Sequence, residues 1–187
     1  MKDTLRQALT ALRSGGLILY PTDTLWGIGC DATNEQAVAR VLALKERDDA
    51  KGLIVLVDTE TRIAGYVEEV PDIAYDLIAL ADRPLTVVFE RAKNLAHNII
   101  ASDGSVGVRV VQHELCQRLV AQLGRPIVST SANLSGSPAP RVLGEVDERI
   151  VRGVDFVVPE RFHGPASDRP SGVVAIGSGG LVRVIRE

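Results

Sequence analysis

Apolar segments typical of β-strands alternate along this chain with segments of helical periodicity, and this alternation restricts the fold more than any other sequence feature. Apolar residues recur at helical spacing across residues 5–12, Gly15 and Gly16 end that pattern, and the β-prone run "LILY" follows. Asn34 then caps a second helical pattern, which leads into the buried strand "GLIVLV". A chain organised in this way is expected to fold as an α/β protein.

The rest of the chain continues the alternation. We expect helices over residues 71–81, 113–123 and 142–151. We expect strands at "LTVVFE", "SVGVRVV", "PIVST", "FVVP", "GVVAIG" and "LVRVIR", with the last two joined as a hairpin across "SGG". "PTDTLWGIGCD" is interpreted as turn-rich. The pattern predicts a single domain, residues 1–187, with a twisted mixed sheet flanked by helices.

Composition and charge exclude several classes of protein. A chain of 187 residues that is 45% hydrophobic can bury a substantial core. A net charge of −3 and a pI near 5.7 argue against coating nucleic acid through bulk positive charge, so any basic site must be local. There is no membrane-spanning run or signal-peptide pattern, which predicts a cytoplasmic protein. Cys30 and Cys116 stand alone and are interpreted as small buried hydrophobic residues.

Three polar segments lie where predicted strands end, which is where α/β proteins bind ligands. The first is "PTDTLWG", in which Thr22 and Thr24 offer hydroxyls at alternate positions. The alternative is that these threonines only cap a turn.

The second segment is "LKERDDAKG". Lys45, Arg47 and Lys51 would place several donors at the mouth of a sheet, as a triphosphate requires. Alternatively, the cations only stabilise the C-terminal dipole of a helix. Asp48 and Asp49 either hold these cations in place or are simply solvated.

The third segment is "PIVSTSANLSGSPAP", where Ser129, Ser131, Asn133 and neighbouring hydroxyls follow a buried strand. Ser/Thr turns explain one or two such residues, but five within seven positions indicate a binding loop. A nucleophilic serine is not favoured because the chain has no GxSxG motif. The glycines match neither a Walker loop nor a dinucleotide fingerprint.

Taken together, "YPTDTLWGIGCDA", the K-x-R of Lys45 and Arg47, and the S-x-N inside "STSANLSG" resemble the YrdC-like family of threonylcarbamoyl-AMP synthases. The resemblance runs in order from the first helix to "PSGVVAIGSGGLVRV". It implies a twisted α/β sheet around a basic concave cavity. It also implies an enzyme that makes threonylcarbamoyl-AMP and pyrophosphate from L-threonine, bicarbonate and ATP.

The resemblance assigns roles to individual residues of this chain. The residues that it implies around threonine are Thr24, Arg109, Ser129 and Ser171. Those that it implies around the nucleotide are Arg47, Lys51, Ser105, Ser131, Asn133, Ala139 and Arg183. Lys45 and Arg47 are implied as the catalytic residues, which donate hydrogen bonds to the phosphates. Without the family, Arg109 would be interpreted as a surface ion pair and Arg183 as solvent-exposed.

The resemblance further implies that Mg²⁺ is held mainly by the ATP phosphates, with no protein metal site. It implies partner proteins that transfer the threonylcarbamoyl group to tRNA, and it leaves tRNA itself as a candidate partner. "ADRPLT" departs from the W-P-G-P-[LV]-T of many relatives, and Leu56 stands where longer relatives have histidine. An RNA-binding module for double-stranded RNA or tRNA, without catalysis, is the alternative function.

Overall fold

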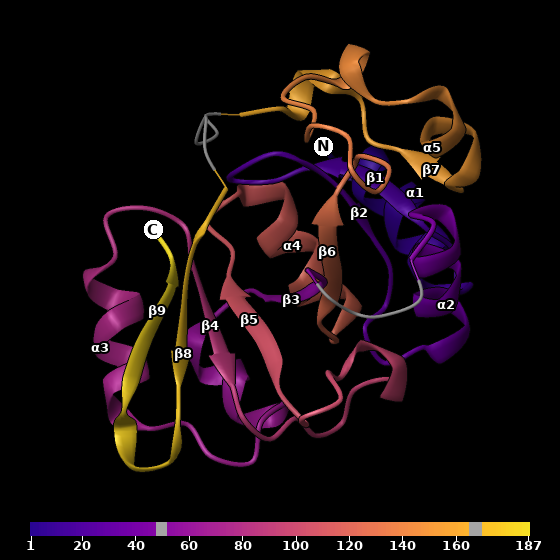
Figure 1. Cartoon of the computed structure of the whole chain (residues 1–187). Helices are drawn as coiled ribbons and strands as arrows, with labels where there is room; N and C mark the ends of the chain where they lie inside the picture. Colours follow the sequence, from indigo (N-terminus) through magenta and orange to yellow (C-terminus); the bar gives the residue numbers. More distant parts are fainter. Residues whose placement is uncertain (48–51, 165–169) are drawn as a thin grey trace.

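The computed structural model describes residues 1–47, 52–164 and 170–187, and its strands form a mixed sheet flanked by helices, as predicted (Figure 1). The strand order across these residues is β7-β1-β2-β6-β3-β5-β4-β8-β9. The strands are β1 (Ile18–Pro21), β2 (Trp26–Gly29), β3 (Ile54–Val57), β4 (Leu85–Phe89), β5 (Val106–Val110), β6 (Ile127–Ser131), β7 (Phe156–Val157), β8 (Gly172–Ile176) and β9 (Val182–Arg186). The α-helices are α1 (Lys2–Arg13), α2 (Glu35–Leu44), α3 (Asp72–Leu80), α4 (Glu114–Leu123) and α5 (Glu148–Gly153).

The alternation of side chains along the strands divides the hydrophobic core between the two faces of the sheet. On β3, Val55 and Val57 belong to the cluster that packs against α2, α3 and α5. Leu56 points the other way and packs with the buried residues of α1 and α4. Each face is therefore covered by its own helices.

The helices α1 and α4 cover only part of their face of the sheet. They pack on each other, and their main strand contacts are with β1, β7 and β3. Farther along the same face, side chains from β4, β5 and β8 line an open cavity instead of a helix interface. This uncovered half of the sheet positions the candidate site.

One strand lies in the segment interpreted as turn-rich, so that interpretation was wrong for residues 26–29. The strand β2 pairs with both β1 and β6. It carries Gly27 and Gly29, which weaken a strand pattern in sequence. Packing requires Gly29, because a Cβ there would lie 2.6 Å from Cε1 of the Tyr20 ring.

The helix predicted over residues 142–151 was wrong in its first half. Leu143–Glu145 form a short 3₁₀ turn, and α5 begins only at Glu148. The Asp147 side chain accepts a hydrogen bond from the Arg149 backbone N–H, which caps the helix at that point. Asn34 caps α2 in the same way, as predicted.

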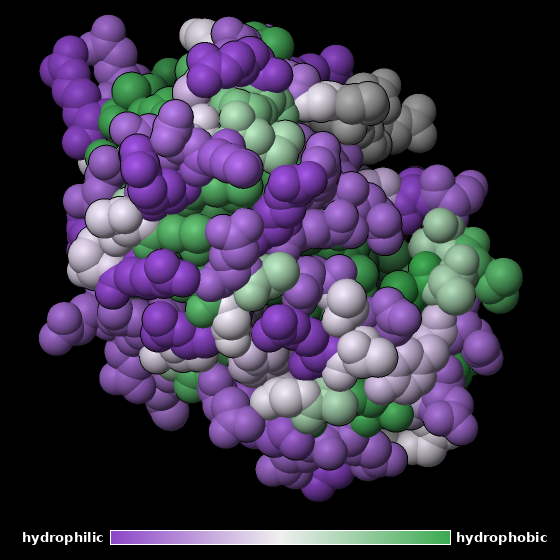
Figure 2. Space-filling view, turned by 180° about the vertical axis from the view of Figure 1, so that it is seen from behind, coloured by the Kyte–Doolittle hydropathy of each residue, from purple (hydrophilic) through white to green (hydrophobic). Residues whose placement is uncertain are grey.

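Hydrophilic side chains cover most of the face opposite to that of Figure 1, with apolar patches between them (Figure 2). Cys30 and Cys116 are both buried and free, as predicted. Within the described ranges, every helix is too short or too polar to cross a membrane.

Candidate active site

A cavity of about 540 Å³ lies over the uncovered half of the sheet. Its lining includes Thr86 and Val88 of β4, Arg109 of β5 and Ser129 of β6. Among the described lining residues, the charged ones are Arg109 and Arg186. Because both are cations, the cavity favours anionic ligands.

The turn between β1 and β2 supplies the two threonine hydroxyls. Thr22 Oγ1 accepts hydrogen bonds from the backbone N–H groups of Thr24 at 3.1 Å and Leu25 at 3.3 Å, and donates its proton to the Leu25 carbonyl at 2.8 Å. The Thr24 hydroxyl lies 3.0 Å from that of Thr22, within hydrogen-bond distance. Thr22 caps the turn, and both threonines line the cavity.

Arg109 and Asp23 form a buried ion pair, not the surface pair expected without the family. Arg109 Nη2 lies 3.1 Å from Asp23 Oδ1, and the two side chains are 4% and 7% exposed. This contact is an ion pair without hydrogen-bond alignment, because Asp23 Oδ1 and Arg109 Nε have no hydrogen-bond partner among the described residues. Arg109 Nη1 donates to Thr24 Oγ1 at 3.3 Å, and the Gln112 N–H donates to Asp23 Oδ2 at 2.9 Å. The guanidinium is held in place, and the hydrogen bond to Thr24 uses only one of its five N–H donors.

A second pair of hydroxyls lies across the cavity. Ser171 Oγ and Thr86 Oγ1 are 2.9 Å apart, and both residues are buried. Ser129 is also buried and lines the same cavity. Thr86 was missed by sequence reasoning, although a polar residue in the apolar strand "LTVVF" was an available signal.

Lys45 links the end of α2 to the loop after β6. Its Nζ donates to the Ser131 carbonyl and, at 2.8 Å, to the Asn133 carbonyl. The side chain is fully buried, and this burial, together with the charge of Arg47, lowers the pKa of Lys45 to about 8. Lys45 thus holds the S-x-N segment in place and is not among the described lining residues.

The spacing of the K-x-R motif follows from how α2 ends. Glu46 adopts φ of 54°, its N–H bonds to the Ala43 carbonyl, and the Arg47 N–H bonds to the Leu42 carbonyl. This is a Schellman motif, which turns the chain sharply after the helix. The Arg47 guanidinium then lies near Gly52, since a Cβ built on Gly52 would be 3.0 Å from Arg47 Nη1. Gly52 lines the cavity, so Arg47 lies close to its rim.

Only some of the other residues predicted to bind the nucleotide line the cavity. Ser105, Ser131 and Ala139 line the cavity. Asn133 lies beside it, where Ser131 Oγ donates to Asn133 Oδ1 and Asn133 Nδ2 donates to the Ser137 carbonyl at 2.6 Å. Arg183 pairs with Ala175 on the cavity side of the sheet, but it is exposed and outside the lining. Lys51, like Asp48 and Asp49, lies outside the described residues.

The two departures from the family pattern lie away from the centre of the cavity. Leu56 is fully buried against α1 and α4 and does not line it. Arg83 lies near the start of β8, where a Cβ on Gly172 would be 3.9 Å from Arg83 Nε.

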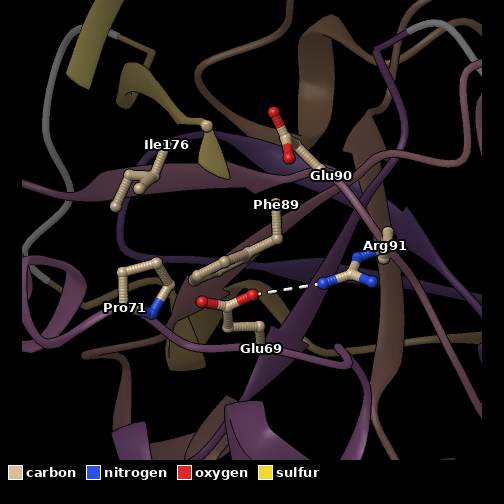
Figure 3. Close-up of a pocket in the computed structure, with 7 residues that line it drawn as sticks. Glu69, Pro71, Phe89, Glu90, Arg91 and Ile176 are labelled. Carbon is tan, nitrogen blue, oxygen red and sulfur yellow. Dashed lines mark hydrogen bonds and ion pairs between the residues drawn. The ribbon is translucent and has the colours of Figure 1, made fainter. Parts of the chain in front are cut away.

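A separate cavity of about 20 Å³ opens between β4 and the segment before α3. Figure 3 shows Glu69 extended toward Arg91, with which it forms a 3.1 Å ion pair, beside the Phe89 ring. A space of this size accommodates roughly one water molecule. It is too small for a nucleotide or an amino acid.

The sequence profile of the Sua5_yciO_yrdC family, described as telomere recombination, matches residues 10–187. A protein of Stutzerimonas stutzeri named threonylcarbamoyl-AMP synthase is 37% identical over 182 residues, which cover 96% of each chain. A protein of Pseudoalteromonas translucida with the same name is 36% identical over 166 residues, which cover 87% of this chain and 89% of that protein.

The fold is also similar to that of Sua5 from P. abyssi, whose crystal structure holds L-threonine. The TM-score is 0.84 at 26% identity, and the match covers 97% of this chain. This chain spans about half of that longer protein, 54% of its length. With a family profile that matches nearly every residue and relatives above 30% identity over most of their length, the chain belongs to the Sua5/YciO/YrdC family.

Proposed function

We propose that this protein is a threonylcarbamoyl-AMP synthase. The amine of L-threonine combines with bicarbonate to give a carbamate and water. An oxygen of the carbamate then forms a bond to the α-phosphorus of ATP, while the bond from that phosphorus to pyrophosphate breaks. The names of the bacterial relatives and the threonine complex of P. abyssi Sua5 support this assignment.

The observation that carries the proposal is the convergence of four separate segments on one cavity. Thr24 comes from the β1–β2 turn, Arg109 from β5, Ser129 from β6 and Ser171 from the start of β8. Each is buried, and together they offer three hydroxyls and one guanidinium. A guanidinium suits the carboxylate of an amino acid, and hydroxyls suit its amine and side-chain hydroxyl.

The nucleotide would bind at the rim formed by Ser105, Ser131 and Ala139. Arg47, whose guanidinium lies near Gly52 at this rim, would bind phosphate oxygens through its planar fork. Lys45 holds the loop that contains Ser131 and Asn133, and its charge lies beside that of Arg47. Lys51, Asn133 and Arg183 complete the set that we assign to ATP.

The reaction brings two anions together, so the residues must offset repulsion and position the reactants. Arg47 and Lys45 would stabilise charge on the departing pyrophosphate. Holding the carbamate in line with the α-phosphorus would lower the activation barrier by on the order of 7–11 kcal/mol at most. Mg²⁺, held mainly by the ATP phosphates, would neutralise part of the triphosphate charge. Across the described residues, no three His, Cys, Asp or Glu side chains are grouped to hold a metal ion.

The test is pyrophosphate release from ATP, threonine, bicarbonate and magnesium by the purified chain. We expect release that requires both threonine and bicarbonate, and a product whose mass is that of threonylcarbamoyl-AMP. Valine lacks the hydroxyl that these side chains would bind, so it should be a much poorer substrate.

An RNA-binding module without catalysis makes the opposite forecast. It requires no pyrophosphate release in the complete mixture, together with tight RNA binding that weakens steeply with salt. That result would replace the proposed function.

We further propose that the product passes to proteins that modify tRNA, in the cytoplasm.

A further inference from the structure

An irregularity in the pairing of β8 with β9 turns Arg186 toward the cavity. Val174 pairs with Val184, but the next pair is Val173 with Arg186, so Ile185 is one extra residue on β9. In a regular strand, Arg186 would point to the same face as Val184. The bulge instead places Arg186 on the face of Val173, and both residues line the cavity. Bulges often re-aim a side chain in this way beside an active site.

The Arg186 guanidinium holds Ser171 through one edge. Its Nε and Nη2 donate to the Ser171 carbonyl at 3.0 and 2.8 Å, and Nη2 lies 3.5 Å from Ser171 Oγ. Ser171 Oγ lies in turn 2.9 Å from Thr86 Oγ1. The last strand of the chain therefore fixes the backbone that carries one of the predicted threonine contacts.

Arg186 also adds to the positive charge of the cavity. Partial burial and, to a lesser extent, the nearby charge of Arg109 lower the pKa of Arg186. Asp23 offsets much of the charge of Arg109, whereas Arg186 donates its hydrogen bonds to the neutral carbonyl of Ser171. An anionic substrate in this cavity would experience the field of both guanidiniums.

We propose that Arg186 is a positioning residue for the amino-acid substrate, which acts by holding the Ser171 hydroxyl in place. This inference rests on the proposed function, because it takes the amino acid to bind at Ser171. It assigns a role to the C-terminal strand, where sequence reasoning selected Arg183 instead.

The first experiment compares Arg186→Ala and Arg186→Lys with the parent, measuring KM for threonine, KM for ATP and kcat by pyrophosphate release. A lost hydrogen-bond contact predicts a KM for threonine about three- to tenfold higher in Arg186→Ala, with KM for ATP changed less than about twofold. Arg186→Lys keeps the charge but loses the planar fork that donates twice to the Ser171 carbonyl, so it should be intermediate. Val184→Ala is the matched control, since Val184 is on the same strand, 61% exposed and on the other face.

A double-mutant cycle with Ser171→Ala separates positioning from a general effect on the strand. If Arg186 acts through the Ser171 hydroxyl, Arg186→Ala should add less than about a twofold change to the threonine KM of Ser171→Ala. If the effects of the two substitutions on the threonine KM are independent and multiply in the double variant, the proposal is overturned. Equal rises in both KM values, or a threonine KM for Arg186→Ala equal to that of the parent, would also overturn it.

Calorimetric titration of the parent with threonine distinguishes failure of this inference from failure of the proposed function. A parent that neither binds threonine nor releases pyrophosphate would contradict both. An active parent with an unaffected Arg186→Ala variant would contradict only the role of Arg186. Melting temperatures of all variants, expected within a few degrees of the parent, show whether the hairpin still forms.

Discussion

The two ends of the cavity are built differently. At the end that we assign to the amino acid, Thr24, Arg109, Ser129 and Ser171 are between 4% and 7% exposed, and most of their polar atoms already contact one another or neighbouring groups. At the end that we assign to the nucleotide, Arg47, Ser105, Ser131 and Ala139 are only half-buried. A preorganised site loses little entropy when it binds a small ligand, whereas an open rim accommodates a larger, mobile triphosphate. Mutations at the two ends should therefore fail in different ways.

The largest effect is expected at the amino-acid end. Arg109→Ala leaves the Asp23 carboxylate buried without its cation, so the free energy of unfolding should fall by about 3–5 kcal/mol. Urea unfolding measures this loss. Arg118→Ala removes an exposed ion pair with Glu114 and should cost less than about 1 kcal/mol.

Removing both charges tests the cause of that loss. The Asp23→Ala/Arg109→Ala double variant should be more stable than Arg109→Ala alone, because no unpaired carboxylate remains. If Arg109→Ala unfolds at the urea concentration of the parent, the amino-acid end is not a rigid, buried pair in solution.

The second effect is expected at the nucleotide end and should appear in activity with little change in stability. Arg47→Lys keeps the charge but loses the planar fork that binds two phosphate oxygens. The kcat/KM for ATP should fall about ten- to hundredfold, as for a lost hydrogen bond to a charged group. The melting temperature should stay near that of the parent, because Arg47 is half-buried at the rim.

Arg152→Lys on α5 is the control, because this side chain is 78% exposed and pairs with Glu148. It should leave kcat/KM unchanged. Full activity of Arg47→Lys, or its unfolding, would remove Arg47 from the nucleotide site.

The third expected effect is a change of stability with pH at the boundary between the two ends. Lys45 has a folded pKa of about 8, below its ordinary value of 10.5. Between these two values the unfolded chain binds a proton that the folded chain has released, so this group makes stability rise with pH through that window. Below pH 8 the cost of burying the charge is fully present.

Lys45→Met removes this contribution. The free energy of unfolding of the parent, measured relative to that of the variant by urea unfolding from pH 7 to pH 10.5, should increase as the pH rises. Parallel curves across that window would mean that Lys45 stays exposed to water in solution.

Much of this architecture could be predicted because its signals are local. The helical spacing across residues 5–12 and the cap at Asn34 depend only on near neighbours, and both α1 and α2 form as predicted. The strand β2 could not be recognised, because its glycines weaken the pattern and only the Tyr20 ring and the neighbouring β6 explain them. Its strand conformation is a consequence of contacts between segments distant in sequence.

The candidate site shows the same division between local signals and contacts made by distant segments. The motifs around Thr24, the K-x-R pair and the S-x-N segment were visible as hydroxyls and cations at strand ends, and Thr24, Ser129 and Ser131 do line one cavity. Arg109 was visible on its strand, but its burial against Asp23 was not, because the two residues are far apart in the chain.

By itself, the sequence determined the alternation of helices and strands, the family and the residue types available for binding an amino acid and a triphosphate. Tertiary structure decided which of these side chains share the cavity. It buried Lys45 on two backbone carbonyls, turned Arg186 inward through a one-residue bulge and left Arg183 outside the lining. The physical reason is that local periodicity follows from covalent spacing, whereas register and burial depend on pairing between distant segments.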